Sequence, residues 1–410
     1  MRTYTGNRRL WMAGATVLAV AVATGMRNTV VAAQSGEGVL ASGVFEGSPS
    51  FTLSNGKLEL IFLPQGASMA SVILTDDGEK MNPLWNPVRM NREQGRDVKP
   101  SSTTGHMICV DGFGPPSPDE RKAGFPFNGE ATSQKFDVQS SRSGSTAEAT
   151  LSAKLPIVQE QVTRTLRMVD GENVVYVESQ LENLMGFDRP INWGEHATIG
   201  SPFLEPGVTV VDLSAGRSQT TEYSNPSSGG GANASTQRRL ASGKEFKWPD
   251  APALDNNSIV DMRQTPEHPH YVDHTATQMD PARKLEWATA LNPKRRLILG
   301  YIFRREDYPW VQTWGNYPSA TSMARGLEFA TQPFSLSRRD ATTQGSMFGT
   351  PMYRWLPAKS KITTKFLMFY ARVPEGFTRV DDVRMENGWI VVQDRAAQKE
   401  IRLAASRTLD

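Results

Sequence analysis

Disulfides and the best-known catalytic signatures are absent from this sequence. Its 410 residues include one cysteine, Cys109, so no disulfide can form within the chain. There is no GxSxG elbow, Walker-type phosphate loop, HExxH pair or CxxC pair. These absences remove the usual sequence support for a serine hydrolase, a nucleotide-binding enzyme or a zinc protease. Histidine is also scarce, and each of the five histidines is therefore a candidate for a specific role.

A strong charge of one sign is lacking as well. The formal net charge is +2, and residues 1–33 contribute four arginines and no acidic residue, so the remainder of the chain carries −2. A nearly neutral chain lacks the one-sided basic surface of a nucleic-acid-binding protein. We therefore expect no nucleic-acid partner.

Long apolar runs are missing except at the start. Residues 10–26 form the run LWMAGATVLAVAVATGM directly after an arginine pair, and Val31-Ala32-Ala33 then supplies small residues. This order is typical of a secretory signal peptide. We predict a signal peptide over 1–33, a periplasmic or secreted mature protein over 34–410, and no stable membrane span after cleavage. The alternative is a retained anchor, although the run of 17 residues is shorter than the about 20 that a bilayer requires.

The remaining pattern alternates between apolar and polar residues. KLELIFLP (57–64), NVVYVESQLEN (173–183) and GWIVVQD (388–394) are examples, and Gly, Pro, Asn and Asp clusters separate such segments. Many short alternating segments predict an all-β antiparallel architecture. No long helical face and no repeat interrupts it, so we expect one β domain over 34–410. SNPSSGGGANASTQ (224–237) is expected to be a flexible loop.

The densest histidine cluster is EHPHYVDH (267–274), which contains His268, His270, His274 and Asp273. Imidazoles and a carboxylate suit zinc or a similar ion. The spacing is not specific, however, and the proline between the first two histidines favours a loop. We expect a polar loop near a ligand and no metal site.

A second candidate is NWGEHATIGSPFL (192–204), which places His196 among small and aromatic residues. Gly194 and Gly200 allow another group to approach the backbone closely. Trp193 offers a flat face of the kind on which sugars stack. The alternative for His196 is a hydrogen-bonded core histidine.

The acid–base partner is expected in RGLEFATQPF (325–334). Glu328 lies between Leu327 and Phe329, so along a strand it projects to the face opposite those apolar side chains. An apolar setting disfavours the charged carboxylate and makes it a stronger base. Arg325 would offset that effect or bind substrate hydroxyls. The alternative is a carboxylate on the surface of a strand.

Together these segments resemble the galactose mutarotase-like superfamily, which comprises aldose 1-epimerases and their relatives. FTLSNGKLELIFLPQGASMASVIL (51–74) and NPLWNP (82–87) are similar to the opening strands of that family. Residues 192–204 resemble the segment that carries the catalytic histidine, and 325–334 resemble the segment that carries the catalytic glutamate. YVDH (271–274) is similar to an Asp-His pair that binds sugar hydroxyls.

The resemblance implies a large antiparallel β-supersandwich with a sugar site in a groove on one sheet. It also implies acid–base catalysis by His196 and Glu328, a monosaccharide or saccharide ligand, and no metal or organic cofactor. The residues that we expect to contact the substrate are His106, Asn128, Trp193, Asp273, Trp314 and Arg325.

One departure concerns GFPFNGEA (124–131), where Asn128 stands at the position of a family histidine. Asparagine can donate a hydrogen bond but does not titrate near neutral pH. His106 is expected either to compensate from the same pocket or to be structural. The sequence thus predicts an aldose 1-epimerase-like enzyme, with a non-catalytic carbohydrate-binding protein as the alternative. A polysaccharide lyase or hydrolase is disfavoured, because the helical half that lyases usually carry is missing.

Overall fold

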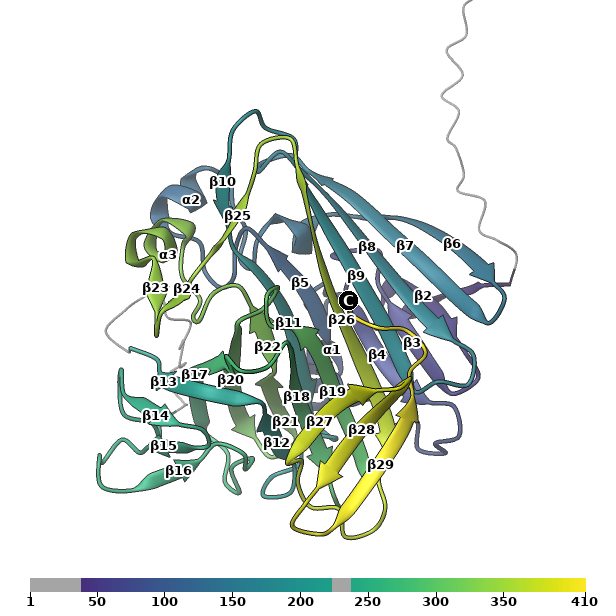
Figure 1. Ribbon diagram of the computed structural model, residues 1–410, viewed down its shortest axis with the longest axis vertical. Coiled ribbons are helices and arrows are strands. Elements are labelled where there is room, and N and C mark those ends of the chain that lie inside the picture. Colours follow the sequence, from purple (N-terminus) through teal and green to yellow (C-terminus); the bar gives the residue numbers. More distant parts are fainter. Residues whose placement is uncertain (1–37, 223–236) are drawn as a thin grey trace, which may run out of the picture. The chain divides into compact units, whose positions relative to one another are not determined.

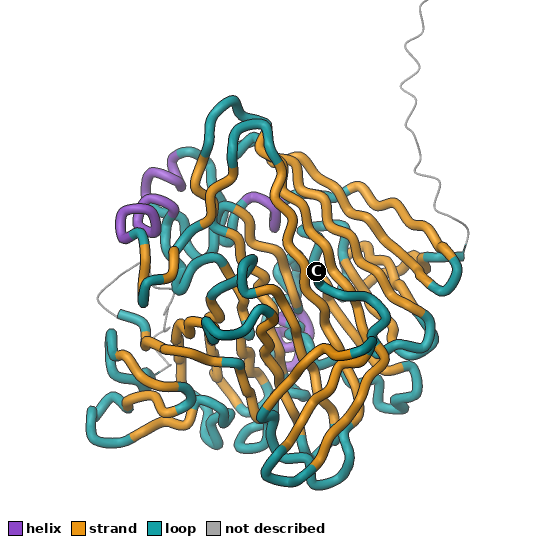
Figure 2. Tube along the Cα trace, in the orientation of Figure 1, coloured by secondary structure: helices purple, strands orange, loops and turns teal. Residues whose placement is uncertain are grey.

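The computed structural model describes residues 38–222 and 237–410 (Figure 1). The predicted signal peptide, 1–33, and residues 224–236 of the predicted loop lie outside the described residues. The described part of 34–410 forms one compact unit. About half of the described residues are in strands, and a few short helices are present (Figure 2). The prediction of an all-β antiparallel fold is confirmed.

Two large antiparallel sheets dominate the described residues. The larger has twelve strands, in the order β1 (Leu40–Phe45), β2 (Ser48–Ser54), β3 (Leu58–Phe62), β4 (Met69–Leu74), β5 (His106–Val110), β11 (Trp193–Gly200), β21 (Ser322–Gly326), β20 (Trp310–Ser319), β17 (Tyr271–Met279), β13 (Ala215–Thr220) and β14 (Glu245–Lys247), with β22 (Glu328–Ala330) paired to β11 and β20. The second has eight strands, in the order β12 (Val210–Leu213), β18 (Leu285–Asn292), β19 (Leu297–Arg304), β26 (Lys361–Arg372), β9 (Val174–Asn183), β8 (Glu160–Val169), β7 (Thr146–Leu155) and β6 (Asp137–Ser143).

The main core lies between these two sheets. In β3, Leu58, Leu60 and Phe62 are fully buried and alternate with less buried residues, as the pattern of 57–64 predicted. Aliphatic side chains of β7, β8 and β9 pack in the same core cluster. Alternation thus directs one face of each sheet inward, and burial of these side chains is the main stabilising contribution.

A second core covers the other face of the eight-stranded sheet. The strands β27 (Asp382–Glu386), β28 (Trp389–Asp394) and β29 (Lys399–Ala404) form a small sheet of their own. Their buried residues, including Ile390 and Val392, pack with Val174, Tyr176 and Trp287 of the larger strands. The middle of the eight-stranded sheet is therefore buried on both faces.

The smaller elements do not belong to either of the two large sheets. Three two-stranded pairs are β10 (Arg189–Ile191) with β25 (Arg354–Leu356), β15 (Asp250–Pro252) with β16 (Ile259–Asp261), and β23 (Ser346–Met347) with β24 (Thr350–Pro351). The helices are α1 (Pro87–Glu93), α2 (Pro118–Lys122), α3 (Arg338–Gln344) and a 3₁₀ turn at Glu130–Ser133. Within the described residues, none of these helices has the length and apolar character needed to span a membrane.

Candidate active site

Strand β11 sends alternate side chains to opposite faces of the twelve-stranded sheet. Trp193, Ala197 and Ile199 belong to the main core between the sheets. His196 and Thr198 lie at the alternate positions and therefore project from the other face. We call this second face the outer face of the twelve-stranded sheet.

Glu328 meets His196 on this outer face. Strand β22 pairs with β11 so that Phe329 lies opposite Glu195, which places Glu328 opposite His196. Leu327 and Phe329 pack in the main core, and Glu328 projects the other way, as the alternation of the segment predicted. The imidazole Nε2 and a carboxyl oxygen are 3.3 Å apart. The two side chains are therefore in direct contact.

Aromatic rings surround this pair. The ring of Phe113 lies 5.7 Å from that of His196, and the ring of Trp314 lies 6.2 Å from it, both edge-on. Trp85 packs against Trp314 with ring centroids 6.2 Å apart. Trp85 and Trp314 are half-buried, whereas Phe113 is buried. Trp314, one of the residues expected to contact the substrate, thus lies beside His196.

Two glycines of β11 make room for these rings. A Cβ on Gly194 would lie 2.8 Å from the Phe113 ring, and a Cβ on Gly200 would lie 2.9 Å from the backbone of Trp85. Such distances are closer than a real Cβ tolerates. The close approach expected at these glycines is therefore present, and the approaching groups are aromatic residues of the chain itself.

A second polar pair lies on the neighbouring strands β17 and β20. His274 lies opposite Trp314, and Gln312 lies opposite Glu328. The Nε2 atom of His274 is 3.1 Å from the amide oxygen of Gln312. Because cross-strand partners share a face, His274 and Gln312 lie on the outer face with His196.

Burial shifts the pKa values of the central pair in opposite directions. Loss of solvent lowers the pKa of His196 from 6.5 to about 4 and raises the pKa of Glu328 well above its ordinary value. Burial therefore favours the uncharged forms of both groups, a neutral imidazole beside a protonated carboxyl. The Nδ1 atom of His196 is 2.8 Å from the hydroxyl of Thr198, which holds the ring in place. The pair has one proton to donate and one site to accept a proton.

Two residues expected to contact the substrate lie on the core face instead. His106 and Trp193 are fully buried between the sheets. His106 Nε2 is 2.9 Å from Glu195, and the indole of Trp193 donates to the same carboxylate at 3.3 Å. Arg164 and Tyr308 complete the shell of Glu195. His106 and Trp193 are therefore structural, because the sheet separates them from the outer face, and His106 does not compensate for Asn128.

Asp273 and Arg325 also point into the interior. Both lie opposite Gly315, at the register positions that face away from Gln312 and Trp314. Asp273 pairs with Arg239 at 2.6 Å, and Arg325 donates to the backbone oxygen of Arg263 at 3.2 Å. Their predicted role in binding the substrate is incorrect for the same reason, since strand alternation places them on the opposite face.

Asn128 stabilises the loop that contains Gly114 through two hydrogen bonds. Its side-chain oxygen accepts from the backbone N–H of Gly114 at 2.8 Å, and its own backbone N–H donates to the Gly114 oxygen at 3.0 Å. It adopts a positive φ of 62°, which asparagine tolerates better than most residues. Asn128 supports the segment that carries Phe113, rather than contacting the His196–Glu328 pair directly.

The three histidines of 267–274 separate in the structure. His268 and His270 lie near the surface, whereas His274 is buried in β17. No group of three or more His, Cys, Asp or Glu side chains in the described residues is arranged to hold a metal ion. The metal interpretation of this cluster therefore has no support from the geometry.

Phe113 and Gln312 are outer-face partners that were not among the residues expected from the sequence. Gln312 stands two residues before Trp314, so strand alternation alone could have placed both on one face. Phe113 had no comparable signal, because it lies in a loop whose path depends on the tertiary fold. The only sequence feature that pointed to Phe113 was Gly194, because a residue without a side chain leaves room for a bulky neighbour.

No protein-family model matches the sequence, and no curated protein matches it. Solved structures do match. A candidate aldose 1-epimerase from Klebsiella pneumoniae is 16% identical with a TM-score of 0.56, covering 81% of this chain and 82% of its own. A galactose mutarotase-like protein from Clostridium acetobutylicum is 11% identical with a TM-score of 0.54, covering 82% and 98%. A galactose mutarotase related enzyme from Lactobacillus acidophilus is 13% identical with a TM-score of 0.51, covering 78% and 97%.

These likenesses establish the fold. The chain has the galactose mutarotase-like β-sandwich, as the resemblance of its short segments implied. At such low identity the likeness shows the fold alone.

Proposed function

We propose that this chain is an exported carbohydrate-active protein that interconverts the anomers of an aldose by acid–base catalysis, with Glu328 and His196 as the catalytic pair. The observation that carries the proposal is the 3.3 Å contact between a carboxyl and an imidazole whose pKa values burial moves in opposite directions. Paired groups with such environments are typical of acid–base sites. The aldose 1-epimerase and mutarotase names of the structural neighbours agree with this chemistry.

The reaction begins with one proton that moves between Glu328 and His196. Transfer of the Glu328 proton to His196 produces a carboxylate and an imidazolium without exchange with solvent. The carboxylate then accepts the proton of the anomeric hydroxyl while the imidazolium donates to the ring oxygen. The C1–O bond of the ring breaks, the aldehyde forms, rotation about C1–C2 follows, and closure reverses the transfers. Each group would contribute on the order of 10²–10⁴ to the rate.

The aromatic surroundings suit such a ligand. Trp314 is half-buried beside His196, and Trp85 packs against Trp314. The faces and edges of these two rings can contact the C–H groups of a pyranose. His196 retains 12% exposure of its side chain, against 3% for Glu328. A sugar would therefore meet the imidazole first and would have to displace it slightly to contact the carboxyl.

The decisive experiment compares Glu328→Gln with the unaltered chain. Freshly dissolved α-galactose and α-glucose would be followed by polarimetry, with the uncatalysed rate subtracted. The variant is expected to lose at least about 10²-fold in rate while its circular dichroism is unchanged, because an amide cannot exchange the proton. Equal rates for the two proteins would remove Glu328 from the mechanism.

A non-catalytic carbohydrate-binding protein is the second candidate. The closed contact between His196 and Glu328, together with Asn128 where relatives have a histidine, favours it. Calorimetric binding of a monosaccharide without any acceleration of anomer exchange would select this alternative.

The location is proposed from the N-terminal sequence. Residues 1–33 have the order of a secretory signal, and the mature chain would then be periplasmic or secreted. N-terminal sequencing of the protein isolated from its native cells tests this, since a processed protein should begin at Gln34.

A further inference from the structure

Residues in and near α2, α3 and β10 line a cavity of about 580 Å³. These three elements lie close together in Figure 1. Five segments line it: the residues that follow α2, the turn between β7 and β8, the loop between β9 and β10, strand β10 itself, and α3. None of the catalytic or aromatic residues of the outer-face site is among its lining residues. Its volume lies within the range of small-molecule sites.

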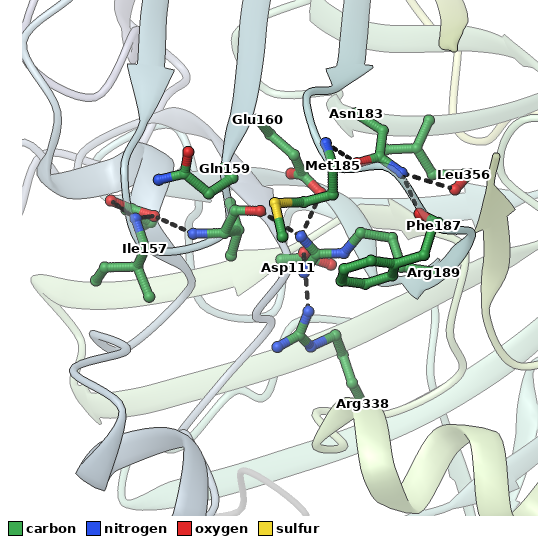
Figure 3. Close-up of polar contacts among 12 residues, drawn as sticks. Asp111, Ile157, Gln159, Glu160, Asn183, Met185, Phe187, Arg189, Arg338 and Leu356 are labelled. Atoms are coloured by element: carbon green, nitrogen blue, oxygen red, sulfur yellow. Dashed lines mark hydrogen bonds and ion pairs between the residues drawn. The ribbon is translucent and has the colours of Figure 1, made fainter. Parts of the chain in front are cut away.

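Part of the cavity wall is apolar, and two of its side chains are exposed. Phe187 is 57% exposed and Ile157 is 40% exposed, and Met185 and Phe125 lie beside them. The loop that carries Phe187 is not loose, because the Asn183 amide donates to the Phe187 backbone oxygen at 2.9 Å (Figure 3). The same side chain accepts from the backbone N–H of Met185. A braced loop that holds a large aromatic side chain toward water indicates a contact surface.

The charged groups on the wall are all cationic. Arg189, Arg338 and Arg339 line the cavity, and no acidic residue is among its described lining residues. Arg189 and Arg338 both donate to one carboxyl oxygen of Asp111, at 2.6 and 3.1 Å (Figure 3). Two guanidinium groups therefore share one carboxylate that lies behind them.

The other acidic neighbours contact these guanidinium groups less closely than Asp111 does. Glu120 is 3.9 Å from the Nε of Arg338, beyond hydrogen-bond distance. Glu160 is fully buried and lies 3.3 Å from Arg189. Burial, reinforced by Asp111, raises the pKa of Glu160 to about 10, so it adds no negative charge at neutral pH. The Arg339 side chain is 79% exposed, and its contact with Asp119 is a loose one at 3.9 Å.

We propose that this cavity is a second ligand site that binds an organic anion, with a carboxylate, sulfate or phosphate group at Arg338 and Arg339 and an apolar body against Phe187 and Ile157. An anion is favoured because guanidinium groups bind such oxygens through paired N–H donors. An apolar body is favoured because it would cover the exposed wall. Arg189 is more buried, with its side chain 11% exposed, and supports Arg338 through Asp111.

Calorimetry with octanoate tests the proposal on the full chain. Octanoate is expected to bind, and Arg338→Gln is expected to weaken its affinity about tenfold or more, because a charged hydrogen bond is lost. Phe187→Ser is expected to weaken it about fivefold through lost apolar contact. Arg339→Gln changes only an exposed side chain, so it tests the charge without risk to the fold and should weaken binding about twofold or more.

Two matched controls test whether the expected losses of octanoate affinity are specific to this cavity. Arg142→Gln alters an exposed arginine of β6 that does not line the cavity, and Glu328→Gln alters the proposed catalytic carboxyl; both should bind octanoate as the unaltered chain does. Equally tight binding of octanol would overturn the role of charge. Equally tight binding of inorganic phosphate or galacturonate would overturn the role of the apolar wall. Unchanged affinity in both arginine variants, or no binding of octanoate, would overturn the site itself.

Discussion

At the scale of single residues, the catalytic proposal depends on two side chains whose neutral forms are favoured by burial. His196 is held by Thr198 on one nitrogen and meets Glu328 at the other. A carboxyl and an imidazole in this state exchange a proton without creating a net charge in the site. The residues alone do not need a metal or a cofactor to perform that exchange.

The pH dependence of the reaction follows from these pKa directions. The pKa of His196 is lowered to about 4, so the imidazole is neutral from about pH 5 upward. Anomer exchange should therefore stay level between about pH 5 and 7 and decline as the pH falls through about 4. A rate profile corrected for the uncatalysed reaction at each pH measures this. A midpoint near 6.5 would mean that the histidine is not desolvated.

The same shift has a consequence for stability. The unfolded chain binds a proton at this histidine below pH 6.5, whereas the folded chain does so only near pH 4. Because the unfolded state then holds more protons, the contribution of His196 to the free energy of unfolding is present above pH 6.5 and is lost as the pH falls toward 4.

Trp314 is expected to bind the ligand rather than to transfer protons. Trp314→Ala removes the half-buried ring beside His196 and should raise KM or the sugar Kd about tenfold, with a smaller effect on kcat. Trp389→Ala is the matched control, since it removes a 41% exposed tryptophan in the small C-terminal sheet. A loss confined to kcat would instead place Trp314 in the chemical step.

At the scale of elements, β11 supports the site through its glycines. Gly194→Ala would place a methyl group 2.8 Å from the Phe113 ring, so the ring or the strand must move. Overpacking of this kind is expected to lower the free energy of unfolding by about 1–3 kcal/mol. Denaturant unfolding measures the loss.

The matched control for that prediction is Gly186→Ala. No atom lies within 4 Å of a Cβ built on Gly186, and this glycine lies in a loop. Its stability should change by less than about 0.5 kcal/mol. Similar losses in the two variants would mean that the close approach of Phe113 to β11 is not what constrains position 194.

At the scale of the whole molecule, the small C-terminal sheet seals the second core. Ile390 is fully buried against residues of the eight-stranded sheet, so Ile390→Ala should cost about 2–5 kcal/mol. Val44→Ala, at a position 74% exposed on β1, should cost less than about 0.5 kcal/mol. If chemical denaturation gave Ile390→Ala a cost as small as that of Val44→Ala, the small sheet would not be part of the cooperative fold.

The alternation of apolar and polar residues in the sequence predicted much of the architecture. It predicted the all-β class, the buried face of β3 and the outward direction of Glu328 between Leu327 and Phe329. These predictions succeed because the two-residue period of a strand is a local property of the backbone. Short segments of the sequence were also enough to indicate the mutarotase-like fold.

The sequence by itself therefore determined the strands, the fold class and the pairing of His196 with a carboxylate far along the chain as a hypothesis. Only the tertiary structure decided which face of the twelve-stranded sheet is the interior. Central strands such as β11 and β17 are buried on both faces, so their sequences carry no mark that distinguishes core from site. For that reason Trp193, Asp273 and Arg325 were expected beside a ligand, and the packing of the second sheet places them in the core.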